Sequence, residues 1–335
     1  MELPKIYNCP GTLSKGFDTY STTCLNKVFF GKKVSHFLNY YPPHSNDDDD
    51  AKFIENRKRI SVSGVQEKLS LILDKNKLRL TKEGEQGNYI LKPIPRDLTK
   101  VNQVPANEHL TMQIASQVYG IQTAQNALIF FKNGEPAYIT KRFDIKEDGS
   151  KWGVEDFASL AGATVENAGY DFKYNSSYEE LSELIRKFVP TYIIELERFF
   201  SLIVFNFLFL NGDAHLKNFS IMETINGDYR LSPAYDLINT RIHVRDTDFA
   251  LDKGLFKDDF ESEQMKNRGM ISLADFYEFA RRLGITKKRR DKLLAPFLIK
   301  QPIVEKLIHN SFLDNQTKRA YLLHFQTRRN NLRKQ

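Results

Sequence analysis

The chain has 335 residues, of which 41% are hydrophobic and 27% are charged, and it includes 25 Phe and 15 Tyr. This composition supplies the apolar bulk of a large core and excludes a wholly disordered chain, while the length predicts two domains or lobes. Lys and Arg total 49 against 42 Asp and Glu, a net charge of +7. That excess is typical of the surface of an ordinary soluble protein. A partner that carries phosphates, such as nucleic acid, is a more specific interpretation, which the net charge alone favours less.

The chain shows no signal for a membrane or for secretion. Its longest apolar stretch, residues 199–210, is interrupted by Ser201 and Asn206 and is shorter than the roughly 18 residues that a bilayer span needs. The first residues lack the apolar segment of a signal peptide. The two cysteines, Cys9 and Cys24, fit a reducing compartment better than a disulfide framework. We therefore expect a cytoplasmic protein with no membrane attachment.

The N-terminal 60 residues differ in composition from the rest of the chain. They are rich in Tyr, Ser, Thr and Asn and contain the acidic run 47–50, which is typical of a solvated, poorly ordered segment. We expect residues 1–60 to form an N-terminal appendage that is partly packed, with a mobile stretch near residues 42–51.

Residues 61–150 read as strands around one helix. A helix is predicted over 105–119, since Leu110, Ile114 and Val118 repeat every four residues and Gly120 can end it. The predicted strands are 69–73, 78–80, 89–92, 124–131 and 136–143.

Residues 151–335 are mostly helical by pattern. Helices are predicted over 154–161, 178–188, 192–210, 273–283, 287–300 and 317–332, with a small hairpin formed by 219–223 and 229–232. A sheet with one helix, followed by a mostly helical half, predicts an α+β fold with two lobes and a boundary near residues 143–155.

A polar loop follows the longest apolar helix. Asp213 and Asn218 lie in it, separated by four residues, which is the spacing of the catalytic loop of protein kinases. In such a loop the Asp accepts the proton of the attacking hydroxyl, and the Asn offers an oxygen to Mg²⁺. Asp236 follows the small hairpin, where a kinase places its second metal-binding Asp, although the usual Asp-Phe-Gly run is absent.

A cation and a carboxylate for a phosphoryl-transfer site occur upstream. Lys92 ends a predicted strand, and Glu108 lies one turn into the following helix, the pairing that positions the phosphates of a nucleotide. The alternative is structural. Lys92 would then be a surface residue, Glu108 would only suit the positive end of its helix, and Asp213 and Asn218 would stabilise a turn. The chain order of all five residues favours the catalytic reading.

The usual glycine-rich phosphate loop is missing, and one segment before the first strand is a candidate for its role. Its small residues would let backbone N–H groups approach phosphate oxygens, although one glycine is equally explained by an ordinary turn. The candidate residues are Ser61, Val62, Ser63, Gly64, Val65, Gln66 and Lys68.

Together these residues resemble the HipA family of bacterial serine/threonine kinase toxins, over about residues 55–335. The chain looks like the shorter, HipT-like form, in which a separate small protein stands in for a missing N-terminal subdomain. The matching pieces are 61–68, 89–93, 107–108, 141–144, 211–220 and 232–239, and the most specific is 213–218.

The resemblance implies a role for each matching residue. Asp213 is the general base, Asn218 and Asp236 hold Mg²⁺, and Lys92 holds the phosphates of ATP and pairs with Glu108. The remaining implied roles are these: Lys141, Arg142 and Phe143 as the hinge against adenine, residues 61–68 as the phosphate loop, and Ser61 and Ser63 as autophosphorylation sites. His215 or Lys217 would contact the γ-phosphate, although His215 is equally explained as a core histidine.

The resemblance also implies a biological function. It predicts a toxin that phosphorylates a Ser or Thr of a translation component, an aminoacyl-tRNA synthetase being the expected target. The expected partner is an antitoxin with a helix-turn-helix, through which DNA would be contacted indirectly. Two alternatives are a small-molecule or lipid kinase of related fold and a non-catalytic component of a toxin–antitoxin repressor complex.

Overall fold

Five strands rich in Leu, Ile and Tyr form one antiparallel sheet in the computed structural model, which describes residues 4–42, 67–95 and 98–333. The order is β2-β1-β3-β5-β4, so each of the five predicted strands is present. The pairing of Lys92 with Tyr138 places the end of β3 in the interior of this sheet. The strands are β1 (Leu69–Asp74), β2 (Lys77–Leu80), β3 (Tyr89–Lys92), β4 (Asn126–Phe130) and β5 (Pro136–Lys141).

Residues 4–42 pack against this sheet. Helix α1 (Thr22–Phe29), which the sequence analysis missed, buries Cys24, Val28 and Phe29 in a core shared with β1, β3 and β4. The Tyr20 hydroxyl donates a hydrogen bond to the carbonyl of Leu128 (2.6 Å). This segment therefore belongs physically to the sheet lobe, while the predicted domain limits at 60 and 150 stay predictions. Residues 43–51 of the predicted mobile stretch lie outside the described residues.

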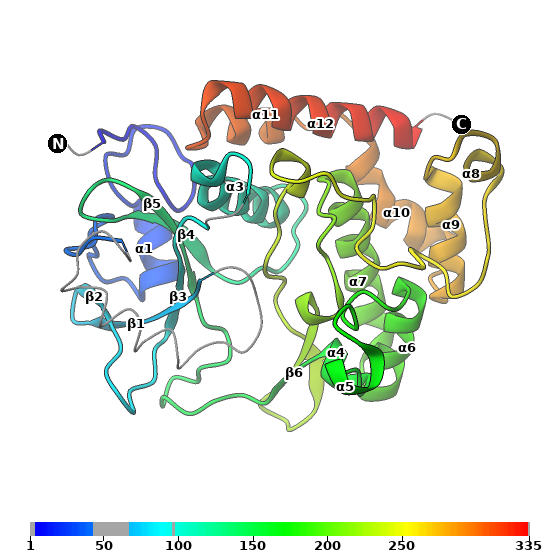
Figure 1. Cartoon of the computed structure of the whole chain (residues 1–335), viewed down its shortest axis with the longest axis horizontal. Coiled ribbons are helices and arrows are strands. Elements are labelled where there is room, and N and C mark those ends of the chain that lie inside the picture. Colours follow the sequence, from blue (N-terminus) through cyan, green and yellow to red (C-terminus); the bar gives the residue numbers. More distant parts are fainter. Residues whose placement is uncertain (1–3, 43–66, 96–97, 334–335) are drawn as a thin grey trace.

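Helix α3 (Val104–Gln117) lies between the sheet and the helical half of the molecule (Figure 1). It follows a short 3-10 turn, η1 (Val101–Gln103), and carries Pro105 in its first turn, where a missing N–H costs nothing. Residues 104–115 are all buried, because the helix is covered on one side by β4 and β5 and on the other by the C-terminal helices. Its polar side chains are thus interior groups that need partners.

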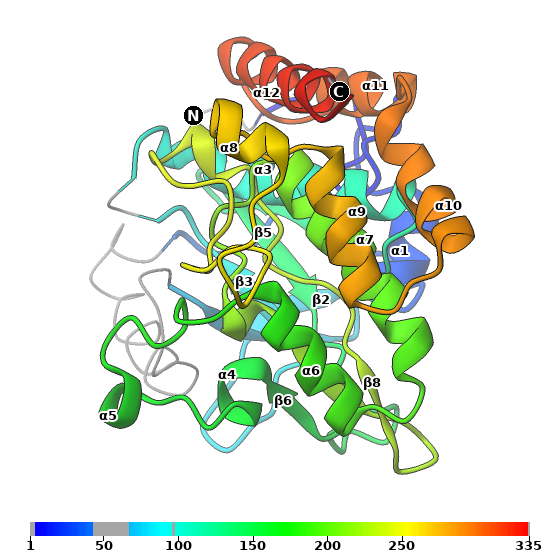
Figure 2. The same ribbon diagram turned by 90° about the vertical axis from the view of Figure 1, so that its right-hand side faces the viewer.

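The helical lobe is built around α7 (Tyr192–Leu208), whose Phe side chains fill its core. Among the described residues no helix combines the length and apolarity of a membrane span. The further helices are α4 (Phe157–Leu160), α5 (Val165–Ala168), α6 (Tyr178–Phe188), α8 (Glu263–Arg268), α9 (Leu273–Arg282) and α10 (Lys287–Leu298). Figure 2 shows α9 and α10 beside α7.

A second, three-stranded sheet completes this lobe. It consists of β6 (Val154–Asp156), β7 (Ser220–Glu223) and β8 (Tyr229–Leu231), and β7 and β8 form the predicted hairpin. The prediction of a helix over 154–161 is wrong for its first three residues. Val154 pairs with Met222 and Asp156 with Ser220, so a long-range strand pairing overrides the local helical pattern.

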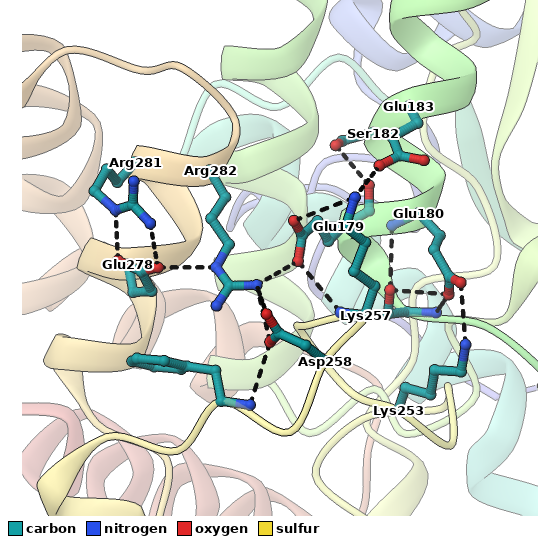
Figure 3. Close-up of polar contacts among 12 residues, drawn as sticks. Glu179, Glu180, Ser182, Glu183, Lys253, Lys257, Asp258, Glu278, Arg281 and Arg282 are labelled. Atoms are coloured by element: carbon teal, nitrogen blue, oxygen red, sulfur yellow. Dashed lines mark hydrogen bonds and ion pairs between the residues drawn. The ribbon is translucent and has the colours of Figure 1, made fainter.

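An ion-pair network around Arg282 ties three elements of the helical lobe together (Figure 3). The guanidinium of Arg282, on α9, donates to Glu179 of α6 (2.8 Å), to Asp258 of the connecting loop (2.9 Å) and to Glu278 (2.8 Å). Its side chain is 13% exposed and lies over the rings of Phe256 and Phe260. Because Arg282 is largely buried and its guanidinium bonds three carboxylates, the network holds α6, α9 and the loop at Asp258 together.

Helices α11 (Pro302–Asn310) and α12 (Asn315–Arg333) cross both lobes (Figures 1 and 2). The Asn310 side chain donates to the carbonyl of Leu13 (3.0 Å) in the sheet lobe, and the hydroxyls of Tyr321 and Thr111 are hydrogen-bonded (2.8 Å). Sequence analysis missed α11, and α12 covers the predicted helix 317–332. The last helices therefore fasten the two lobes to each other.

Candidate active site

Lys92 is the centre of a buried charge cluster between the lobes. Its Nζ donates to Glu108 Oε1 (2.7 Å), on α3, and to Asp236 Oδ1 (2.6 Å), from the segment after β8. The side chains of Lys92 and Glu108 are each 4% exposed, and that of Asp236 is 30% exposed. Three of the five residues expected in a phosphoryl-transfer site thus meet at one point.

Burial and charge act against each other in this cluster. Burial alone would lower the pKa of Lys92, but the carboxylates of Asp236 and Glu108 outweigh it and hold that pKa above its usual range. Burial raises the pKa of Glu108, against the opposing effect of Lys92. For Asp236, Lys92 and Lys68 overcome the effect of burial and lower the pKa. The ammonium therefore stays protonated, which is the state in which a lysine side chain can bind phosphate.

A second lysine approaches the same carboxylate. Lys68 Nζ lies 4.0 Å from Asp236 Oδ2, so the last residue of the predicted phosphate loop reaches the cluster. The other predicted residues of that loop, 61–66, lie outside the described residues. Asp236 itself has a positive φ of 56°, a conformation that Asp adopts more readily than most residues and that is common at functional sites.

Asn107 connects α3 to the segment that carries Asp236. It is buried, its Nδ2 donates to the carbonyl of Asn239 (2.9 Å), and its Oδ1 accepts from the Asn239 N–H (3.2 Å). The same amide nitrogen lies 2.9 Å from His243 Nε2. Since Glu108 is the next residue on the helix, this contact sets the position of the Glu108–Lys92 pair relative to Asp236.

The loop after α7 is held by hydrogen bonds between side chains and backbone groups. The Gly212 N–H donates to Thr240 Oγ1 (2.9 Å), and a Cβ at Gly212 would lie 2.9 Å from the backbone carbonyl oxygen of Thr247, so a larger residue would require the backbone there to shift. Asn218, at the end of the 3-10 turn η2 (Leu216–Asn218), donates through Nδ2 to the carbonyl of Asp213 (2.7 Å). The two predicted residues of the catalytic loop are thus bonded to each other.

Asp213 presents its carboxylate at the surface of this loop. The side chain is 53% exposed, and its Oδ1 accepts a hydrogen bond from the Tyr174 hydroxyl (3.0 Å). The sequence analysis missed Tyr174, because a single tyrosine four residues before a helix carries no recognisable spacing. A partly exposed, anchored carboxylate can accept a proton from an approaching hydroxyl.

His215 precedes the turn η2, and Lys217 lies within it. His215 is buried, and its Nε2 is 3.9 Å from Asp213 Oδ1. Burial lowers the pKa of His215 and favours the neutral ring, and it outweighs the Asp213 carboxylate, which acts in the opposite direction. Among the described residues its Nδ1 has no hydrogen-bond partner. Lys217 Nζ lies over the ring of Phe172, 5.2 Å from its centroid.

Of the three predicted hinge residues, only Phe143 approaches the cluster through a described contact. It stacks on Tyr235, the neighbour of Asp236, with ring centroids 5.9 Å apart, and lines a pocket of about 360 Å³ together with Trp152. By contrast, Lys141 Nζ lies over the ring of Phe30, and Arg142 is paired with Asp144 (2.5 Å).

The residues expected to hold Mg²⁺ are suitable in chemistry. Asn218 and Asp236 offer an amide oxygen and a carboxylate, the hard ligands that Mg²⁺ prefers, and Mg²⁺ is commonly bound by few protein groups together with substrate phosphates. In residues 4–42, 67–95 and 98–333 there is no cluster of three or more His, Cys, Asp or Glu that could hold a metal alone.

A sheet lobe with one central helix, a helical lobe and a Lys–Glu–Asp cluster between them define a two-lobed, protein-kinase-like fold. The model of the HipA-like C-terminal domain family matches residues 60–301, and the chain belongs to this family.

Two relatives share a moderate fraction of the sequence. A Haemophilus influenzae protein named "Putative kinase" is 28% identical over 273 residues, which cover 77% of this chain and 78% of the relative. A Sinorhizobium fredii protein, Y4dM, with the same kind of name, is 30% identical over 241 residues, covering 66% of this chain and 56% of the relative.

Two solved structures share the fold. HipA from Shewanella oneidensis, in a complex of a toxin–antitoxin system with HipB and its operator DNA, is 22% identical with a TM-score of 0.60; the match covers 81% of this chain and 63% of HipA. The Helicobacter pylori proinflammatory kinase CtkA is 16% identical with a TM-score of 0.50, covering 79% of this chain and 93% of CtkA.

Proposed function

We propose that the chain is an ATP-dependent serine/threonine protein kinase. The observation that carries the proposal is the position of Lys92 Nζ, within 2.7 Å of Glu108 and 2.6 Å of Asp236 in the interior between the lobes. A cation fixed by a helix carboxylate and a second carboxylate nearby are what phosphoryl transfer requires to hold triphosphate and metal. An ion pair with a purely structural role could be fully buried, whereas the Asp236 side chain is 30% exposed and accessible to a ligand.

The proposed chemistry divides among the five residues. Lys92 binds phosphate oxygens of ATP and Glu108 keeps it in place, while Asn218 and Asp236 hold Mg²⁺, which neutralises charge on the phosphates when bound. The acceptor hydroxyl forms a bond to the γ-phosphorus as the bond from that phosphorus to ADP breaks, and its proton passes to Asp213. Rate then comes from positioning and charge compensation rather than from a covalent intermediate.

We further propose that the predicted loop 61–68 binds the nucleotide phosphates and carries regulatory phosphorylation sites. Its backbone would bind phosphates, with Lys68 already beside Asp236, and Phe143 would contact adenine. We propose Ser61 and Ser63 as autophosphorylation sites, because a phosphate there adds a charge of about −1.5 to −2 where the nucleotide phosphates bind. Ser61→Asp and Ser63→Asp are expected to weaken ATP binding in calorimetry, whereas Ser→Ala variants retain it. Unchanged affinity in the Asp variants would contradict this regulatory role.

The solved relative in complex with HipB and operator DNA supports a toxin function. We propose a HipA-type toxin with a DNA-binding antitoxin as partner, acting in the cytoplasm on a translation component such as an aminoacyl-tRNA synthetase. The match leaves more than a third of HipA uncovered, and the shorter, HipT-like form remains a prediction.

The test is phosphate transfer by wild type beside Asp213→Asn, with phosphoproteomics after brief expression. We expect the variant to lose all but a trace of the transfer activity while keeping its fold and its affinity for Mg·ATP. Asp259→Asn, at an exposed position of the helical lobe, is the matched control and should retain full activity. Wild-type transfer by Asp213→Asn would end the assignment of the base. Label incorporated only into lipids or small molecules would favour the first alternative function, and failure of wild type to bind Mg·ATP would favour a non-catalytic component.

A further inference from the structure

The hydroxyl of Tyr174 is a hydrogen-bond donor to the carboxylate of Asp213. The Oη–Oδ1 distance is 3.0 Å, which is within the range of a sound hydrogen bond. We propose that Tyr174 is a positioning residue for phosphoryl transfer, which holds one oxygen of Asp213 so that the other is presented to the acceptor hydroxyl. This inference rests on the proposed function, since it gives Asp213 the role of general base.

The backbone around Tyr174 is fixed from two sides. The Leu216 N–H of the catalytic loop donates to the carbonyl of Lys173 (3.0 Å), and the Asp252 N–H donates to the carbonyl of Tyr174 (3.1 Å). The Tyr174 ring meets the edge of the His215 ring, with centroids 5.3 Å apart and planes at 70°. Since the backbone and the ring are both held, the phenol is a fixed support rather than a group that swings in from solvent.

The chemistry of a phenol suits this task. Burial, followed by the charge of Asp213, raises the pKa of Tyr174, so the hydroxyl remains a donor at neutral pH. His215 Nε2, at 3.9 Å from the same oxygen, is too distant for a hydrogen bond. Asn218 bonds the Asp213 backbone carbonyl and not its side chain. Tyr174 therefore restrains the carboxylate itself, where the other two residues restrain or cover the loop.

A rival interpretation treats Tyr174 as a stand-in for the acceptor, because an acceptor hydroxyl would also lie about 3 Å from the base. In that case the phenol would block the site and would have to leave before substrate binds. The two interpretations predict opposite effects of removing the hydroxyl. A positioning residue loses turnover, whereas a blocking residue gains turnover or lowers the KM for the acceptor.

The experiment compares wild type, Tyr174→Phe and Tyr170→Phe in the full chain. Tyr170 lies four residues earlier and is 88% exposed, which makes it a matched control. The probe is Mg·ATP with labelled γ-phosphate and a degenerate Ser/Thr peptide mixture, and the measured quantities are kcat, KM for peptide and for ATP, and the melting temperature. We expect Tyr174→Phe to lower kcat roughly 5- to 20-fold with both KM values and the melting temperature unchanged, and Tyr170→Phe to match wild type.

A second comparison separates positioning from a general structural effect. In an Asp213→Asn background, Tyr174→Phe should change the residual transfer rate less than twofold, since the carboxylate that it serves is absent. An unchanged or increased kcat in Tyr174→Phe, or an equal loss in both backgrounds, overturns the inference while leaving the proposed kinase function intact. Absence of transfer by wild type under all conditions overturns the proposed function, and the inference with it.

Discussion

Replacing Lys92 with Met removes the ammonium that contacts both Glu108 and Asp236. Asp236 remains near Lys68 and is 30% exposed, but Glu108 is left as a buried carboxylate without its counter-ion. A buried charge deprived of its partner costs about 3–5 kcal/mol. Glu108 can escape part of this by binding a proton, which at pH 7 costs about 3 kcal/mol from its ordinary pKa of 4.5. We therefore expect Lys92→Met to lose about 3 kcal/mol of unfolding free energy at pH 7.

The sign of the pH dependence follows from the same residue. In the variant, the folded-state pKa of Glu108 lies above the unfolded value, so above pH 4.5 the folded chain binds more protons than the unfolded chain. Stability of the variant relative to wild type should then rise as the pH falls, and the loss should shrink to about 1 kcal/mol or less at pH 5.

The assay is urea unfolding of wild type, Lys92→Met and Lys92→Met/Glu108→Gln at pH 7 and pH 5, with ATP binding measured in parallel. The double variant should recover most of the lost stability at pH 7, because its amide is neutral, and should still fail to bind ATP. Equal losses of unfolding free energy at both pH values would refute the idea that the unpaired Glu108 carboxylate destabilises Lys92→Met. No recovery of stability in the double variant would refute it as well.

Two further substitutions test how the lobes are held. Asn107→Leu removes the hydrogen bonds to Asn239 and should cost about 2–4 kcal/mol of unfolding free energy and reduce phosphate transfer. Gln117→Leu, at the exposed end of the same helix, removes hydrogen bonds to Thr12 and Gln113 and should cost about 1 kcal/mol or less without affecting transfer. A stable, fully active Asn107→Leu would refute the role of the contact with Asn239. Arg282→Met should cost about 2–4 kcal/mol of unfolding free energy, since buried Glu179 loses its shorter ion pair and keeps the longer one, with Lys257 (4.0 Å). Arg281→Met, at a side chain 71% exposed, should have little effect in the same unfolding assay, and similar losses from both variants would contradict the importance of burial.

The order of the site residues along the chain is readable from sequence, while their geometry is not. Lys92 and Glu108 were expected on a strand and on the next helix, and the structure places them there with Nζ and Oε1 2.7 Å apart. That distance depends on how α3 packs on the sheet, and on the tie between Asn107 and Asn239, which joins positions 132 residues apart. The roles of the site residues remain predictions.

The errors in the predicted helices and strands also arise from contacts between residues that are distant in the sequence. Val154 pairs with Met222, 68 residues later, so no local pattern could have identified β6. Helix α1 is short and its buried residues are matched to the sheet rather than to one another. Tyr174 was missed because its partner Asp213 is 39 residues away. Where contacts with distant segments determine the conformation, the local spacing of residue types does not predict it.

Helices α11 and α12 give the end of the chain an effect on the site. Residues 302–333 contact Leu13 at one extreme of the sequence and Thr111 on the helix that carries Glu108. During synthesis these contacts cannot form until residues 302–333 have left the ribosome. A chain truncated before residue 302 would lack the contacts of α11 and α12 with α3, so we expect the helix that carries Glu108 to be fully held only after residues 302–333 have folded onto it.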